Sequence, residues 1–155
     1  PKWFEGGVRI LGLRQTPYPS FALVTHPAYV NEHFSVIKPY VEETPDTLMM
    51  GRAMVGVLNS RLAAFWFWHQ KRKGYQLQID KSILTAFPQP VEMAHELVEH
   101  LAQCVARLME ESCLAPEQKL LQYELNQTVE RMYALSKEQR QTITTWWLSR
   151  YQPDR

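Results

Sequence analysis

The fold class is decided by residues 47–70, whose sequence is TLMMGRAMVGVLNSRLAAFWFWHQ. Apolar residues recur there every three to four positions, which is the period of a helix with one buried face. They are Leu48, Met49, Met54, Val55, Leu58, Leu62, Phe65 and Trp66. Pro45 and Asp46 precede the stretch as helix-start signals, and Gly74 follows its expected end. The pattern therefore predicts one long helix over residues 47–70.

Short strands are expected before and after this helix. Residues 8–13, 21–25 and 34–38 are rich in β-branched and aromatic side chains, and Pro17, Pro19 and Pro27 separate them. Gly6-Gly7 supplies turn chemistry before the first run. Residues 75–79 are a further strand candidate, and Asp80 should cap a short helix over residues 81–86. We expect a small, mostly antiparallel sheet with the long helix packed on it.

The second part of the chain is predicted to be helical. Pro88 and Pro90 enforce an extended link, because a residue before proline is pushed out of the helical region. Apolar stripes follow over residues 94–109 and 121–132, and Ser136 with Gln139 has the spacing of a capping box. Three helices in so short a segment imply antiparallel hairpins. The expected fold is α+β, with residues 1–90 as the α+β part and residues 91–155 as a helical hairpin tail.

Length and composition are those of one globular domain, or of two small modules that share a core. The chain has 155 residues, of which 45% are hydrophobic and 21% are charged. The net charge of +1 is unevenly distributed. Residues 1–90 hold ten Lys or Arg against six Asp or Glu (+4), whereas residues 91–155 hold seven against ten (−3). The first part is therefore the better candidate for binding a polyanion.

The sequence predicts a cytoplasmic protein that does not enter a membrane. No apolar run approaches the ~20 residues that a bilayer requires, and no charged leader precedes an apolar segment. Cys104 and Cys113 are expected in one helix about 13 Å apart, at ~1.5 Å per residue, and so unable to pair. The chain begins at Pro1 without an initiator Met, which suggests a processed protein or an excised piece of a longer one.

Motifs of catalysis are absent from the sequence. It contains no G-x-G-x-x-G, no G-x-x-x-x-G-K-[ST] and no G-x-S-x-G motif. His95 and His100 resemble the zinc-protease H-E-x-x-H motif with one residue too many, and this spacing turns the second imidazole by roughly 140° from the first. We therefore predict no catalytic site and no metal site, and a binding module rather than an enzyme.

Residues 1–90 contain basic, aromatic and amide side chains that are candidates for binding DNA. They belong to Arg9, Arg14, Gln15, Tyr18, Lys38, Lys71, Arg72, Lys73, Tyr75, Gln76 and Lys81. The run Lys71 to Lys73 has two interpretations, which the residues alone leave open. Its charges can complement the negative end of the preceding helix, or they can contact phosphates. In the second case Gln15 or Gln76 would contact base edges.

The order of several short motifs resembles a known family. These are Val8-Arg9-Ile10, PYPSFA at 17–22, Tyr29-Val30-Asn31, residues 34–38, VLNSRL at 57–62, GYQL at 74–77 and LTAFPQP at 84–90. Together they are similar to the target-recognition region of adenine-specific DNA methyltransferases. The likeness is to the TaqI-like C-terminal specificity domain of fused type IIG restriction-modification enzymes and related phage-defence methyltransferases. The Leu-Asn-Ser helix start and the Pro-x-Pro exit also resemble specificity subunits of type I systems.

The resemblance covers about residues 2–145 and implies a function. The chain would be the sequence-specific DNA recognition fragment of a larger adenine-N6 DNA methyltransferase or fused restriction-modification enzyme. Its partners would be double-stranded DNA and a missing N-terminal methyltransferase domain, which would bind S-adenosylmethionine. This chain lacks the Asn/Asp-Pro-Pro-Tyr motif and the glycine-rich cofactor loop, so it would hold neither catalytic residues nor cofactor. The residues chosen to contact bases are Gln15, Thr16, Tyr18, Tyr75 and Gln76, with phosphates contacted by Lys71, Arg72 and Lys73.

The helical tail suggests an alternative function of a different class. The acidic helical tail has heptad-like apolar stripes, which favour packing between helices. It would then be a protein–protein interaction module that braces a missing domain, with DNA contact marginal.

Overall fold

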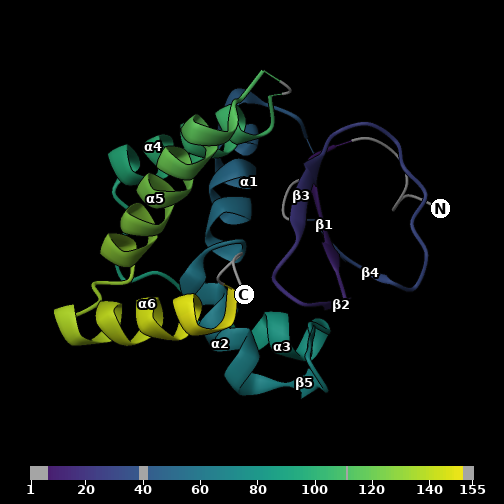
Figure 1. Ribbon diagram of the computed structural model, residues 1–155. Helices are drawn as coiled ribbons and strands as arrows, with labels where there is room; N and C mark the ends of the chain where they lie inside the picture. The colour runs from purple at the N-terminus through teal and green to yellow at the C-terminus, as the bar shows by residue number, and fades with distance from the viewer. Residues whose placement is uncertain (1–6, 39–41, 111, 152–155) are drawn as a thin grey trace.

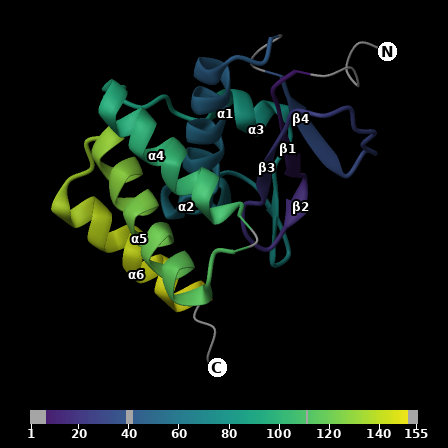
Figure 2. The same ribbon diagram turned by 90° about the horizontal axis from the view of Figure 1, so that it is seen from above.

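The computed structural model describes residues 7–38, 42–110 and 112–151 and has the predicted α+β architecture (Figure 1). A helix, α1 (Pro45–Leu58), lies between a β-sheet on one side and two helices, α4 (His95–Leu108) and α5 (Ala115–Met132), on the other. Figure 2 shows the same three layers from above. The last helix, α6 (Lys137–Tyr151), packs against α2 (Arg61–Gln70).

The first sheet contains the three strands predicted at the start of the chain. They are β1 (Arg9–Leu13), β3 (Phe21–Val24) and β4 (Phe34–Ile37), in the order β3-β1-β4 and antiparallel throughout. Gly12 faces Phe21, whose ring lies so close that a Cβ at Gly12 would be 2.3 Å from it. Gly6 of the predicted turn lies outside the described residues, whereas Gly7 has a φ of 103°. The sheet packs against α1 through β1 and β3.

The prediction of one long helix over residues 47–70 was wrong. The helix breaks after Leu58, and α2 begins anew at Arg61. Asn59 is the C-cap of α1, and its side-chain amide donates to the carbonyl of Phe21 (2.8 Å) and accepts from the Phe21 N–H (2.9 Å). Ser60 then caps α2 by accepting from the Ala63 N–H (3.2 Å). Short polar side chains thus offer the backbone an alternative to a continuous helix.

A second, smaller sheet was only partly predicted. It has the antiparallel order β2-β6-β5, formed by β2 (Gln15–Thr16), β6 (Gln76–Gln78) and β5 (Arg72–Lys73). Strand β6 lies within the predicted residues 75–79. Strands β2 and β5 were not predicted, because two residues are too few to show a periodic pattern in the sequence. Gly74, with a φ of 63°, is the first of two loop residues that join β5 to β6 as a hairpin. Positive φ at this position suits a two-residue hairpin turn.

Several predicted helix ends are confirmed. Asp80 caps α3 (Lys81–Ala86), accepting a hydrogen bond from the Ile83 N–H (3.1 Å). Ser136 and Gln139 form the capping box at the start of α6: the Gln139 side chain accepts from the Ser136 N–H, and the Ser136 hydroxyl accepts from the Gln139 N–H. Cys113 was placed wrongly, because α4 ends at Leu108 and Cys113 lies in the connection to α5. Both cysteines are buried and free.

One hydrophobic core joins the two predicted parts of the chain. Ile10 and Phe67 from the first part belong to the same buried cluster as Leu101, Leu125 and Val129 from the helical tail. Residues 1–90 and 91–155 therefore share a core. Among the described residues, no helix is both long and apolar enough to cross a membrane.

Candidate nucleic-acid interface

The β5–β6 hairpin and the residue before it carry five of the twelve predicted DNA-binding residues at the surface. Lys71 ends α2, Arg72 and Lys73 form β5, and the turn places Tyr75 at the tip, where it is 89% exposed. In the hairpin register, Lys73 lies opposite Gln76. All six residues from Lys71 to Gln76 are exposed. The structure thus brings three cations, a tyrosine ring and an amide together at the surface.

Two of the three cations are oriented by neighbours within the chain. The Lys71 ammonium donates to the carboxylate of Asp80 (2.8 Å), and the Arg72 guanidinium lies over the Trp68 ring, 4.8 Å from its centroid. The hydrogen bonds from Lys71, Ser82 and the Ile83 N–H hold the pKa of the Asp80 carboxyl well below its usual range. Asp80 therefore keeps its negative charge beside Lys71, while both cations stay at the surface.

Arg150, which the sequence analysis missed, joins this surface from the far end of the chain. Its guanidinium carbon lies 3.0 Å from the centroid of the Trp68 ring, so Trp68 contacts both Arg72 and Arg150. Cations over an aromatic face are attracted by its quadrupole. No local pattern could have linked Arg150 to Arg72, because the packing of α6 on α2 joins them. We call Lys71, Arg72, Lys73 and Arg150 the basic hairpin surface.

Gln15 and Thr16 of β2, and Tyr18 just after it, were predicted to contact DNA, but they divide between surface and interior. Gln15 is exposed and pairs with Gln78 of β6, so it lies in the same small sheet as the hairpin. Thr16 is only 3% exposed, and its hydroxyl donates to the Tyr18 carbonyl (2.6 Å). Tyr18 is 53% exposed, with its ring edge-on to Tyr151 of α6. Gln15 and Tyr18 can therefore reach a ligand, whereas the choice of Thr16 needs correction because its side chain is buried.

Arg9 also needs correction. It lies on β1 and is 2% exposed, because its guanidinium donates to the carbonyl of His26 within the protein. A buried, hydrogen-bonded arginine holds a loop to a strand and offers no charge to a phosphate.

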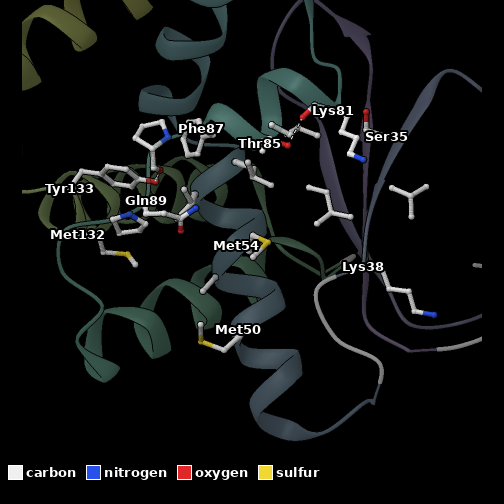
Figure 3. Close-up of a pocket in the computed structure, with 18 of the residues that line it drawn as sticks. Ser35, Lys38, Met50, Met54, Lys81, Thr85, Phe87, Gln89, Met132 and Tyr133 are labelled. Carbon is white, nitrogen blue, oxygen red and sulfur yellow. Dashed lines mark hydrogen bonds between the residues drawn. The ribbon is translucent and has the colours of Figure 1, made fainter.

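Arg14, Lys38 and Lys81 lie elsewhere, around a cavity of about 760 Å³ (Figure 3). The cavity lies between β4, α1, α3 and the end of α5, and apolar side chains such as Met50, Met54 and Phe87 form much of its lining. Arg14 donates to the carbonyl of Glu32 (3.2 Å). None of the described hairpin residues 71–76 lines this cavity. The predicted set thus separates into the hairpin with its neighbour Gln15, the exposed Tyr18 beside Tyr151 of α6, the cavity residues, and the two buried side chains.

Exposed apolar side chains gather on the helical tail. They include Met109 at the end of α4, Leu114 just before α5, and Leu120 and Tyr123 on α5.

The chain was compared with known proteins. No protein-family model matches it, and no similar protein was found among curated proteins.

Proposed function

We propose that this chain is a DNA target-recognition module whose basic hairpin surface contacts double-stranded DNA. In this proposal it is the specificity fragment of a larger adenine-N6 DNA methyltransferase or fused restriction-modification enzyme. Methyl transfer and S-adenosylmethionine binding belong to a separate N-terminal domain, and the parent enzyme can also carry endonuclease activity.

The observation that carries the proposal is the exposed β5–β6 hairpin with three consecutive cations. A two-stranded β-ribbon fits the major groove of B-DNA, which is about 12 Å wide. Lys71 at the end of α2 precedes Arg72 and Lys73 of β5, so three successive residues present cations at the exposed side of the hairpin. Such charges gain affinity by releasing condensed counterions from the phosphates. Strand β2 covers the other side of β6 at Leu77 and Gln78, so the turn end, where Lys73 pairs with Gln76, is the part of the hairpin suited to enter a groove.

Polar and aromatic side chains at the tip supply groups for base contact. Tyr75 is the second residue of the turn, Gln76 follows it directly, and Gln15 lies on the neighbouring strand β2. A glutamine amide can bond to adenine through N6 and N7 at once. The hairpin thus combines positioning groups with a group that can distinguish bases.

The test is the binding of short fluorescent duplexes across a series of salt concentrations. We expect the logarithm of the association constant to fall linearly with the logarithm of salt concentration, with a slope of about −2.7 or steeper for three or more phosphate contacts. The same series with an equally long acidic polypeptide serves as the control for non-specific polyanion binding. Failure to bind duplexes even at ~20 mM salt would refute the proposal.

Gln76 is predicted to affect sequence preference rather than general affinity. In Gln76→Ala, binding to the preferred sequence should weaken by about 1–3 kcal/mol, the value of a bidentate base contact, with random duplexes unaffected. Selection from a random duplex library, before and after the change, measures the preference. Gln141→Ala, an exposed glutamine on α6, is the matched control. An unchanged preference in Gln76→Ala would remove this residue from the base-contacting set.

Asp80 is predicted to weaken DNA binding in the native protein. Asp80→Asn should retain the cap of α3, because asparagine caps helices as well as aspartate does. It removes the negative charge beside Lys71, so duplex affinity at low salt should rise several-fold and the salt slope should steepen by up to about 0.9. Asp46→Asn makes the same charge change at the start of α1 and should have a smaller effect. If the two variants raise duplex affinity equally, the net charge of the protein, and not the position of Asp80 beside Lys71, determines the effect.

The exposed apolar side chains of the tail favour a second candidate function, a helical interaction module that braces a missing domain. Met109, Leu114, Leu120 and Tyr123 would form the contact. If this function is the main one, serine substitutions at Leu114 and Leu120 would abolish association with the rest of the parent enzyme and leave any duplex binding unchanged.

A further inference from the structure

A cluster of potential metal ligands lies between α4 and α5, away from the basic hairpin surface. His100 and Cys104 are four residues apart on α4, and residues at this spacing lie on the same face of a helix. Glu124 reaches the pair from α5, which packs beside α4 (Figure 2). The sequence analysis predicted no metal site, because His95 and His100 are five residues apart. In this cluster His100 is instead beside Cys104, one turn further along α4, and His95 takes no part.

The distances among the three ligand atoms are close to those of a tetrahedral zinc site. The Cys104 sulfur lies 3.8 Å from Nε2 of His100 and 4.0 Å from Oε2 of Glu124. All three atoms lie within 4.8 Å of one another. Tetrahedral bonds of the usual zinc–sulfur, zinc–nitrogen and zinc–oxygen lengths put ligand atoms about 3.4–3.6 Å apart. Small rotations of the His100 and Glu124 side chains, which reach solvent, would close this difference.

The surroundings of the cluster give it one closed and one open side. Cys104 is buried and belongs to the hydrophobic core, whereas Glu124 is half-buried and His100 is exposed. The core therefore fixes the sulfur, and the imidazole and carboxylate complete the set from the surface. A fourth position faces solvent and suits a water molecule, as in zinc sites with three protein ligands.

We propose that His100, Cys104 and Glu124 form a zinc-binding site that links α4 to α5. The donor set of sulfur, nitrogen and oxygen selects zinc over magnesium or calcium, which prefer oxygen ligands alone. On binding, the Cys104 thiol loses its proton to solvent as the sulfur–zinc bond forms. The site connects the two helices whose packing completes the core of the tail. It is independent of the DNA contacts proposed for the hairpin.

The experiment is a titration of the metal-free, reduced protein with Co²⁺, followed by displacement with Zn²⁺. A thiolate-to-cobalt charge-transfer band and the intense visible bands of four-coordinate cobalt should appear with a single equivalent and vanish on adding zinc. His100→Gln and Cys104→Ser should each weaken cobalt binding by about 100-fold or more, since even second-shell changes cost 10- to 100-fold. His100 is exposed, so its variant keeps the test valid if Cys104→Ser folds poorly.

Two matched controls are present in the same chain. His95→Gln changes the other exposed histidine of α4, and Cys113→Ser changes the other buried free cysteine. Both should bind cobalt as the native protein does. Zinc should also raise the melting temperature of the native protein and of both controls, but not that of His100→Gln. Absence of the charge-transfer band in the native protein, or its loss in Cys113→Ser but not in Cys104→Ser, would overturn the proposal.

Discussion

A variant in which Lys71, Arg72 and Lys73 are all alanine should bind every duplex on the order of 100-fold more weakly at ~0.1 M salt, whatever its sequence. Each phosphate contact contributes about 0.9 to the salt slope, so the slope should become shallower by up to about 2.7. Fluorescence anisotropy with several duplexes across a salt series measures both quantities. The loss should be uniform, because contacts to phosphates carry no sequence information.

The matched control removes the same charge from the helical tail. Lys119, Lys137 and Arg140 are exposed on α5 and α6, and their joint change to alanine alters the net charge equally. This control should lose only a small part of the affinity. If the two triple variants weaken binding to the same extent, net charge alone governs the interaction. If the hairpin variant binds as the native protein does, its cations serve the helix end, and the alternative left open by the sequence is correct.

Leu101→Ala is expected to lower the free energy of unfolding by about 2–5 kcal/mol, the usual loss for deleting a fully buried leucine. Leu101 has no exposed surface, and it packs against α1 so closely that a Cβ at Gly56 would lie 2.8 Å from it. Chemical denaturation followed by circular dichroism and by tryptophan fluorescence measures the loss. The two signals should change together, because residues of both predicted parts belong to one core.

Leu120→Ala provides the comparison for that experiment. Leu120 lies on α5 but is 56% exposed, so its change should cost no more than about 0.5 kcal/mol. Separate transitions for helicity and fluorescence in Leu101→Ala would indicate that the chain does not unfold as one cooperative unit. They would then support a modular tail, despite the shared core.

Local sequence patterns predicted the elements whose causes are themselves local. The cap at Asp80, the capping box of Ser136 and Gln139, and the α+β class all depend on residues a few positions apart. The break between α1 and α2 was missed although it has a local signal, since Ser60 caps α2 through the Ala63 N–H; the apolar period continues across it. Only the bond from Asn59 to the backbone of Phe21, thirty-eight positions earlier, leaves no local trace. The two-residue strands β2 and β5 are too short to carry a periodicity.

The candidate DNA-binding surface was only partly predicted from local sequence. The three consecutive cations Lys71 to Lys73 are evident from the sequence alone, and the structure places them at an exposed hairpin. The burial of Arg9 could not be foreseen, since the carbonyl to which its guanidinium donates belongs to His26, seventeen positions later. Arg150 and the group of His100, Cys104 and Glu124 depend on helix packing, which brings distant residues together.

The amide of Asn59 also has a consequence for self-association. Strand β3 is at the edge of its sheet, and such an edge offers unpaired N–H and C=O groups to strands of other molecules. At Phe21 both groups are already bonded to the Asn59 side chain, which occupies the position that an added strand would take. The residue that ends α1 thereby also protects the sheet from growing into an intermolecular aggregate at this point.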